Sequence, residues 1–190
     1  MTAIVGIKKK VKGQYETIIA AESMITEGAT RSHLVNNEKV LCFPQFIVGF
    51  SGLCTVQTVL IEMLEDKKFL KNKFMKMETI SDAAKFAREV YKELYDRISH
   101  LNDDSSQSVG HLLIATSGKM YIADRWSFIS EYEDYCFIGC GEDFVAGVVQ
   151  SNYKKLGSKN DIIKLANKAL EHVSQRSAAC GGKIYIYDLS

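Results

Sequence analysis

Among the residues that are able to do covalent chemistry, Thr2 has the most informative position. The chain opens Met1-Thr2-Ala3, and removal of Met1 would leave Thr2 with both a hydroxyl nucleophile and a free α-amine. An α-amine has a pKa near ~8, so it can act at neutral pH as the general base for the hydroxyl of its own residue. Because many unrelated chains also begin with Met-Thr, the hypothesis of an activated threonine depends on what surrounds it.

An activated threonine must be held by regular structure, and short apolar runs follow it closely. Runs rich in β-forming residues alternate with pairs of longer segments that have helical spacing. Helices that arrive in consecutive pairs favour antiparallel sheets with helices outside, here in one domain spanning residues 1–190. We predict strands at 3–7, 17–21, 39–42, 46–50, 111–115, 120–123, 135–138 and 183–188, helices at 56–64, 80–95, 144–149 and 161–173, and a loop at 102–108.

Composition narrows the function classes. The 24 basic and 23 acidic residues give a net charge of +1, which does not favour nucleic acid or an anionic membrane as a partner. No apolar run approaches the ~18 residues of a membrane span, and no leader sequence is visible, so we expect a cytoplasmic protein. The 5 cysteines and 4 histidines show no zinc-site spacing, and the odd cysteine count argues against a disulfide framework. The run Lys8–Lys10 is predicted to be a solvated strand end.

The order of short motifs resembles the proteasome β-subunit family, and in particular its HslV-type peptidases. The opening threonine precedes an apolar strand, and a second strand ends in two small residues, the acid Glu22 and, four residues later, Thr26. The remaining matches are a lysine before a strand, a small-residue turn before a helix, a Gly-X-Gly before a helix, and a Gly-Gly before the last strand. The matching segments are 2–7, 18–26, 38–40, 48–52, 138–141 and 181–187. The resemblance implies an α+β fold, the αββα four-layer sandwich of N-terminal-nucleophile (Ntn) hydrolases.

The resemblance also implies roles for particular residues. Thr2 would be the nucleophile, with Lys39, Glu22 and Cys140 as the supporting catalytic residues. Backbone N–H groups near Ser51 and Gly52 would form the oxyanion hole, and substrate would add as a strand beside Thr26. No cofactor is required, although backbone groups of Gly182, Tyr185 and Asp188 would by resemblance bind a monovalent cation such as Na⁺.

Two residues of the proposed site depart from the family pattern, and Met1 raises a separate question. Glu22 stands where the family has Asp, and its extra methylene moves the carboxylate by ~1 Å, a displacement that can cost about 100-fold in rate. Cys140 stands where the family usually has Ser, and a thiol is the weaker hydrogen-bond donor. A retained Met1 would convert the amine of Thr2 into an amide, which cannot act as a base.

Three functional hypotheses remain at this point. The first is a threonine peptidase that cleaves polypeptides inside a homo-oligomeric ring and is fed by an ATP-dependent unfoldase. The second is a structural or assembly protein of the same fold, with a weakened or inactive site. The third is a small-substrate amidohydrolase of the wider Ntn group, which the short chain without insertions disfavours.

Overall fold

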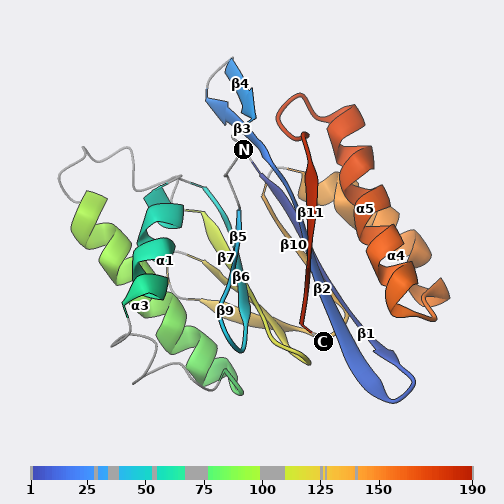
Figure 1. Ribbon diagram of the computed structural model, residues 1–190, viewed down its shortest axis with the longest axis horizontal. Coiled ribbons are helices and arrows are strands. Elements are labelled where there is room, and N and C mark those ends of the chain that lie inside the picture. The colour runs from blue at the N-terminus through green and yellow to red at the C-terminus, as the bar shows by residue number, and fades with distance from the viewer. Residues whose placement is uncertain are drawn as a thin grey trace.

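The computed structural model describes residues 2–27, 30–33, 39–52, 55–66, 77–98, 110–124, 126, 128–139 and 141–189. Within these residues the chain forms two large antiparallel sheets that lie face to face, with helices on both outer sides, and a separate two-stranded hairpin (Figure 1). No helix in the described ranges combines the length and apolar character needed to cross a bilayer.

The first sheet carries Thr2 at the start of a central strand. Its strand order is β10-β1-β2-β11, with every neighbouring pair antiparallel. The helices α4 and α5 and a short 3₁₀ turn, η2, cover its outer face (Figure 1). The bounds are β1 Ala3–Val11, β2 Gln14–Glu22, β10 Tyr135–Gly139, β11 Ile184–Asp188, α4 Glu142–Asn152, η2 Tyr153–Lys155 and α5 Lys159–Arg176.

The packing of α5 follows directly from its sequence. Ser158 caps the helix by accepting the Asp161 N–H at 3.2 Å. The apolar residues then recur three or four positions apart, which places them on one face. That face is buried against the first sheet and consists of Ile162, Leu165, Ala166, Ala169, Leu170 and Val173.

The second sheet has the strand order β5-β6-β7-β8-β9, again antiparallel throughout. The helices α1 and α3 pack on its outer face around a core in which Phe46 stacks on Phe43 and meets Phe86 edge to face. The bounds are β5 Val40–Cys42, β6 Ile47–Ser51, β7 His111–Ala115, β8 Met120–Asp124, β9 Ile129–Tyr132, α1 Thr55–Glu65 and α3 Ile80–Ile98.

The inner faces of the two sheets pack on each other. This central core includes Ile4 and Ile19 from the first sheet and Val40, Ile47 and Leu113 from the second. Alternate residues of β1 therefore point to different cores: Ile4 faces the other sheet, whereas Ala3 and Val5 face α4 and α5. The αββα sandwich expected from the family resemblance is confirmed.

Some elements differ from the sequence prediction. The hairpin β1–β2 is longer than predicted and closes through the two-residue turn Lys12-Gly13, with φ of 50° and 93°. Because the hairpin is longer, Lys8 lies within the folded structure and only 6% of its surface is exposed. The prediction of a solvated strand end was therefore wrong for this residue. The short strand β9 was not predicted, and neither was the hairpin of β3 (Met24–Glu27) and β4 (Thr30–His33). The predicted loop at 102–108 lies outside the described residues.

Candidate active site

Thr2 lies at the entrance to β1 and is 7% exposed. The next residue, Ala3, is opposite Gly139 in the ladder between β1 and β10. A Cβ atom on Gly139 would lie 1.9 Å from the carbonyl oxygen of Thr2, and Gly139 has a φ of 101°. Only glycine tolerates both conditions, so the first glycine of the Gly139-Cys140-Gly141 motif serves the close approach of β10 to Thr2.

The carboxylate of Glu22 is the centre of the hydrogen bonds beside Thr2. Its Oε1 accepts the Ala3 N–H at 2.9 Å and the Lys39 ammonium at 2.6 Å. Its Oε2 accepts the Met24 N–H at 2.7 Å and the Gly181 N–H at 3.1 Å. Glu22 is 2% exposed, so these four donors replace the water that a buried carboxylate has lost.

Lys39 forms the other half of a buried ion pair and is 4% exposed. Its ammonium also donates to the carbonyl oxygen of Met24. Its own carbonyl accepts the Phe50 N–H at 3.0 Å, which joins the start of β5 to the end of β6. The structure therefore brings Lys39 and Glu22 together directly next to the backbone of Thr2. The exact family role of each residue stays a prediction.

The segment before β11 is tied to the same place, and sequence reasoning did not assign it a role there. Gly181 donates to Glu22, and its carbonyl accepts the Met24 N–H at 3.0 Å. Ser23, beside Glu22, accepts the Lys183 N–H at 2.9 Å through its hydroxyl. Two sequence features could have indicated these contacts: the Gly181-Gly182 pair, and Ser23, a small hydroxyl residue next to Glu22.

Ser51 is the last residue of β6, directly after Phe50, and Gly52 follows it. The Ser51 hydroxyl accepts the His111 N–H at 3.3 Å, and Gly52 is exposed with a φ of 114°. A Cβ on Gly110 would lie 1.7 Å from the carbonyl oxygen of Ser51, so this glycine allows the turn to pack closely. Gly110 thus shapes the predicted oxyanion segment, although the sequence alone did not single it out.

Two of the predicted residues cannot be placed in the same detail. Cys140 lies outside the described residues, between Gly139 and Gly141. Thr26 belongs to β3, where it is opposite Arg31, but its side chain lies outside what the structure describes. Their roles remain predictions from the family resemblance.

The three residues suggested for a cation do not meet at one point. Tyr185 and Asp188 both lie in the extended strand β11, opposite Ala21 and Ile18. Three residues of strand span about 10 Å, whereas the oxygen ligands of one ion must all lie within about 2.5 Å of it. Gly182 precedes the strand with a φ of 87°. This set does not fit a shared Na⁺ ion, and we assign it no part in the chemistry.

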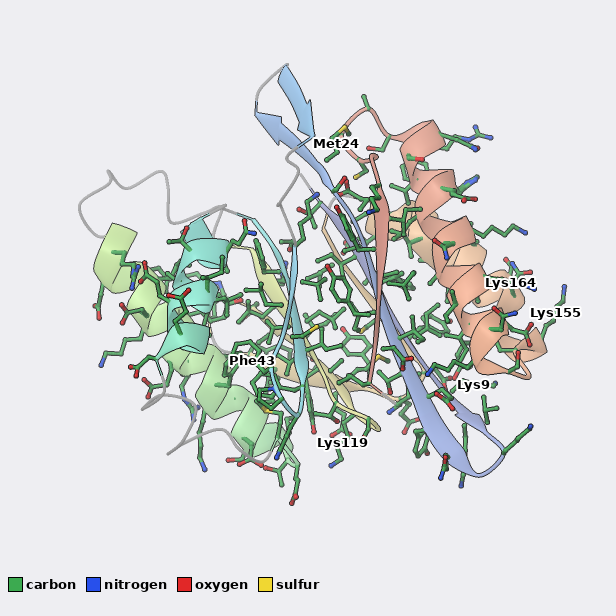
Figure 2. The ribbon with its side chains drawn as sticks, viewed as in Figure 1. Lys9, Met24, Phe43, Lys119, Lys155 and Lys164 are labelled. Atoms are coloured by element: carbon green, nitrogen blue, oxygen red, sulfur yellow. The ribbon has the colours of Figure 1, made fainter. Side chains whose placement is uncertain are left out.

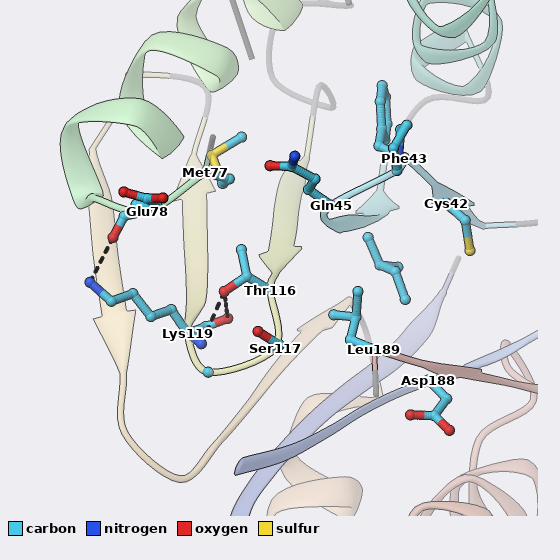
Figure 3. A pocket seen from close by; sticks show the side chains of 13 residues that line it. Cys42, Phe43, Gln45, Met77, Glu78, Thr116, Ser117, Lys119, Asp188 and Leu189 are labelled. Carbon is cyan, nitrogen blue, oxygen red and sulfur yellow. Dashed lines mark hydrogen bonds between the residues drawn. The ribbon is translucent and has the colours of Figure 1, made fainter. Parts of the chain in front are cut away.

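Asp188 instead lines a cavity of about 740 Å³ (Figure 3). This cavity also contains Cys42, Phe43 and Leu189, and Lys119 at its wall donates to the Glu78 carbonyl at 2.7 Å. None of the residues of the Glu22 network lines it. The cavity is therefore separate from the candidate active site.

We expect Glu22→Gln to lower the free energy of unfolding by about 3–5 kcal/mol, because removing one charge of a buried pair leaves the Lys39 ammonium uncompensated. Glu22→Asp should have a smaller effect of the same sign, since the four donors lie where the longer side chain meets them. Urea denaturation measures both, with Glu131→Gln, an exposed carboxylate, as a control expected within about 0.5 kcal/mol of the parent. A Glu22→Asp protein as stable as the parent would contradict this reading of the geometry.

We also expect Gly139→Ala to move Thr2 or to destabilise the fold, because the added Cβ meets the Thr2 carbonyl and the residue has a positive φ. The matched control is Gly118→Ala, where the nearest atom lies 3.8 Å from the added Cβ. Thermal unfolding of both proteins gives the comparison. Equal melting temperatures would show that β10 does not depend on glycine at this contact.

Comparison with known proteins agrees with this architecture. A proteasome subunit of Saccharomyces cerevisiae, beta type-3, is 27% identical over 155 residues, covering 79% of this chain and 72% of the yeast subunit. Thiobacillus denitrificans BPH, solved in complex with epoxomicin, superposes with a TM-score of 0.77 at 13% identity and covers 99% of both chains. Eukaryotic HslV from Trypanosoma brucei gives 0.70 at 16% identity and covers 98% of each. The family model for the proteasome subunit matches residues 2–189, and the chain belongs to this family.

Proposed function

We propose that this proteasome-type subunit is a threonine peptidase with Thr2 as its nucleophile. The observation that carries the proposal is the Lys39–Glu22 pair at 2.6 Å, whose carboxylate oxygen also accepts the N–H of Ala3 at 2.9 Å. An ammonium is thereby buried beside the carboxylate that accepts the N–H of Ala3, the residue next to the proposed nucleophile. Such a charge favours the anionic forms that develop during attack on a carbonyl.

The chemistry requires the amine of Thr2 to be free. The hydroxyl oxygen would attack the carbonyl carbon of a peptide bond while its proton passes to the α-amine, which lies in the same residue. Collapse of the tetrahedral intermediate would return that proton to the leaving amine and leave an ester on Thr2. Water would then hydrolyse the ester with the same amine as base.

The other residues of the proposal hold the substrate. Backbone N–H groups at Ser51 and Gly52 would stabilise the oxyanion, and the contact with Gly110 fixes the turn that carries them. The peptide would add its backbone to the edge of β3 near Thr26, where main-chain hydrogen bonds are independent of substrate sequence. This mode of binding suits a peptidase for unfolded polypeptides.

A structural subunit is the second candidate, and one observation favours it. Glu22 joins β1, β3, the segment before β11 and Lys39, so the Glu22–Lys39 pair would stabilise the fold even in a subunit without catalysis. A retained Met1 would leave such a subunit intact and inactive. The two candidates differ in the reactivity of Thr2.

We expect an epoxyketone probe to form one covalent adduct per chain at Thr2. Thr2→Ala should abolish the adduct because the hydroxyl is lost, whereas Thr2→Ser, the matched control, should keep it. Intact mass followed by peptide mapping locates both the adduct and the presence or absence of Met1. A chain that lacks Met1, assembles and still fails to react would establish the structural candidate.

We further propose that the chain works in a homo-oligomeric ring in the cytoplasm, supplied by an ATP-dependent unfoldase. Two large aromatic side chains support an interface: Trp126 is 74% exposed and Phe128 is 68% exposed, in the connection between β8 and β9. Asp124 accepts the N–H groups of both residues, at 2.9 and 3.0 Å, and so fixes the backbone that presents them. Exposed aromatic pairs of this kind mark protein interfaces.

We expect native mass spectrometry to give a mass several times the 21.3 kDa of one chain. Trp126→Ser combined with Phe128→Ser should shift the protein toward monomer, because the apolar contact area is lost. Ile80→Ser removes a single residue that is 42% exposed and serves as the control, with no expected change. A parent protein that is monomeric at micromolar concentration would refute the ring.

A further inference from the structure

A basic hollow lies at the far end of β1, about 20 Å along the strand from Thr2. It has a volume of about 530 Å³ and is lined by the three lysines 8–10, the rings of Tyr15 and Tyr153, and the acidic residues Glu133 and Asp134. We call it the lysine pocket. Figure 2 shows Lys9 on the hairpin end of β1, beside the helices that cover the first sheet.

The backbone of β1 is open beside this pocket. The ladder with β10 ends at Ile7 opposite Tyr135, after which the Lys8 N–H donates to the Asp134 carbonyl at 2.7 Å. Backbone N–H groups alternate between the two edges of a strand, so the N–H of Lys10 faces the same edge as that of Lys8. The ladder between β1 and β10 stops at Ile7 and Tyr135, so it contains no partner for the N–H of Lys10.

Lys8 brings a buried positive charge to the pocket. Its side chain is nearly enclosed, and its ammonium donates to the carbonyl of Tyr132 at 3.1 Å. An ammonium has three donors, and no carboxylate among the described residues lies within ion-pair distance of it. A buried charge without a counter-charge is unfavourable, so an anion entering the pocket would be stabilised there.

The two neighbouring lysines are held by aromatic rings rather than by acids. The Lys9 ammonium lies 4.2 Å from the centroid of Tyr153, and that of Lys10 lies 5.9 Å from the centroid of Tyr15. Tyr153 is fixed because its hydroxyl lies within hydrogen-bond distance of two acceptors, the carbonyl of Lys8 at 2.6 Å and the carboxylate of Asp134 at 2.7 Å, which share its one proton. Asp134 shares that proton with the Lys8 carbonyl, and none of the three ammonium groups forms an ion pair with a carboxylate among the described residues.

Burial, together with the hydrogen bond to Asp134, raises the pKa of the Tyr153 hydroxyl. The hydroxyl therefore keeps its proton and its role as a donor at neutral pH. Tyr153 therefore adds no negative charge to the pocket, and the acidic groups of its lining are the carboxylates of Glu133 and Asp134 beside the three lysines.

We propose that the lysine pocket binds a phosphate group. Three ammonium groups and the N–H of Lys10 offer more donors than the two oxygens of a carboxylate can use, whereas a phosphate presents several oxygens and up to two charges. Lysine is a common phosphate ligand that acts as a point charge. The phosphate would come either from a free inorganic species or from a nucleotide whose base contacts Tyr15, which is 50% exposed. This site is independent of the proposed peptidase activity.

The test is calorimetric titration of the purified, assembled protein with sodium pyrophosphate, at constant ionic strength in buffer free of phosphate. We expect saturable binding with one site per chain. Lys9→Gln and Lys10→Gln should each weaken it at least about tenfold, as expected for a lost charge-assisted hydrogen bond. Lys12→Gln is the matched control: it removes the same charge from the exposed turn of the same hairpin, outside the pocket, and should change the affinity less than about twofold.

A second titration with ATP distinguishes the two sources of phosphate. Tighter binding of ATP than of pyrophosphate, lost in Tyr15→Ala, would identify a nucleotide, and equal affinities would identify the free species. Unfolding midpoints of the variants confirm that Lys9→Gln and Lys10→Gln remain folded. Equal weakening in Lys9→Gln, Lys10→Gln and Lys12→Gln, or heats that do not saturate, would overturn the proposal in favour of diffuse attraction, including attraction to nucleic acid.

Discussion

The structure around Thr2 depends on one buried carboxylate that satisfies four donors from four parts of the chain. Glu22 accepts hydrogen bonds from the start of β1, from β3, from the segment before β11 and from Lys39. The Met24 contact is local, but the other three donors are 17, 19 and 159 positions from Glu22 along the chain, so only the folded structure brings them together. Because the group is buried, its charge is tolerable only while all four donors stay in place. The termini of the domain and the entrance of the site are therefore held by the same charge.

Glycines supply the second constraint, since two close backbone approaches around the site leave no room for a Cβ atom. Gly139 allows β10 to pass against the Thr2 carbonyl, and Gly110 does the same for the carbonyl of Ser51. Both have positive φ, which a residue with a Cβ adopts only under strain. The backbones of the candidate nucleophile and of the candidate oxyanion segment are thus packed in the same way, each against a glycine at the end of a neighbouring strand.

The order of short motifs along the sequence predicted the sandwich, and the family resemblance singled out Glu22 and Lys39, which the structure pairs while their catalytic roles stay predictions. Helical periodicity in 161–173 and the acid followed four residues later by Thr26 can be seen without any long-range information. The contribution of Gly181 and Ser23 could not be predicted from the sequence. Their contacts join positions about 160 residues apart and depend on backbone donors, which have no sequence signature. Lys8 was misjudged for a similar reason: three consecutive lysines suggest a solvated surface, but β9, Tyr153 and the longer hairpin enclose the first of them. The cation set came from the resemblance alone, and the extended geometry of β11 places Tyr185 and Asp188 too far apart to share one ion.

The Glu22–Lys39 pair serves an active subunit and a structural subunit alike. A charge pair that fixes four segments would be kept for stability in either case. The contact of Gly139 with residue 2 involves a carbonyl oxygen, which any amino acid would supply, so this packing places no demand on the side chain there. Packing at Gly139 therefore does not explain why residue 2 is a threonine. The peptidase proposal does explain it, because the residue lies next to the N–H that the Glu22–Lys39 pair holds. If Thr2 is the nucleophile, as proposed, activity depends on its amine and hydroxyl, and the Glu22 carboxylate holds the adjoining backbone through the Ala3 N–H.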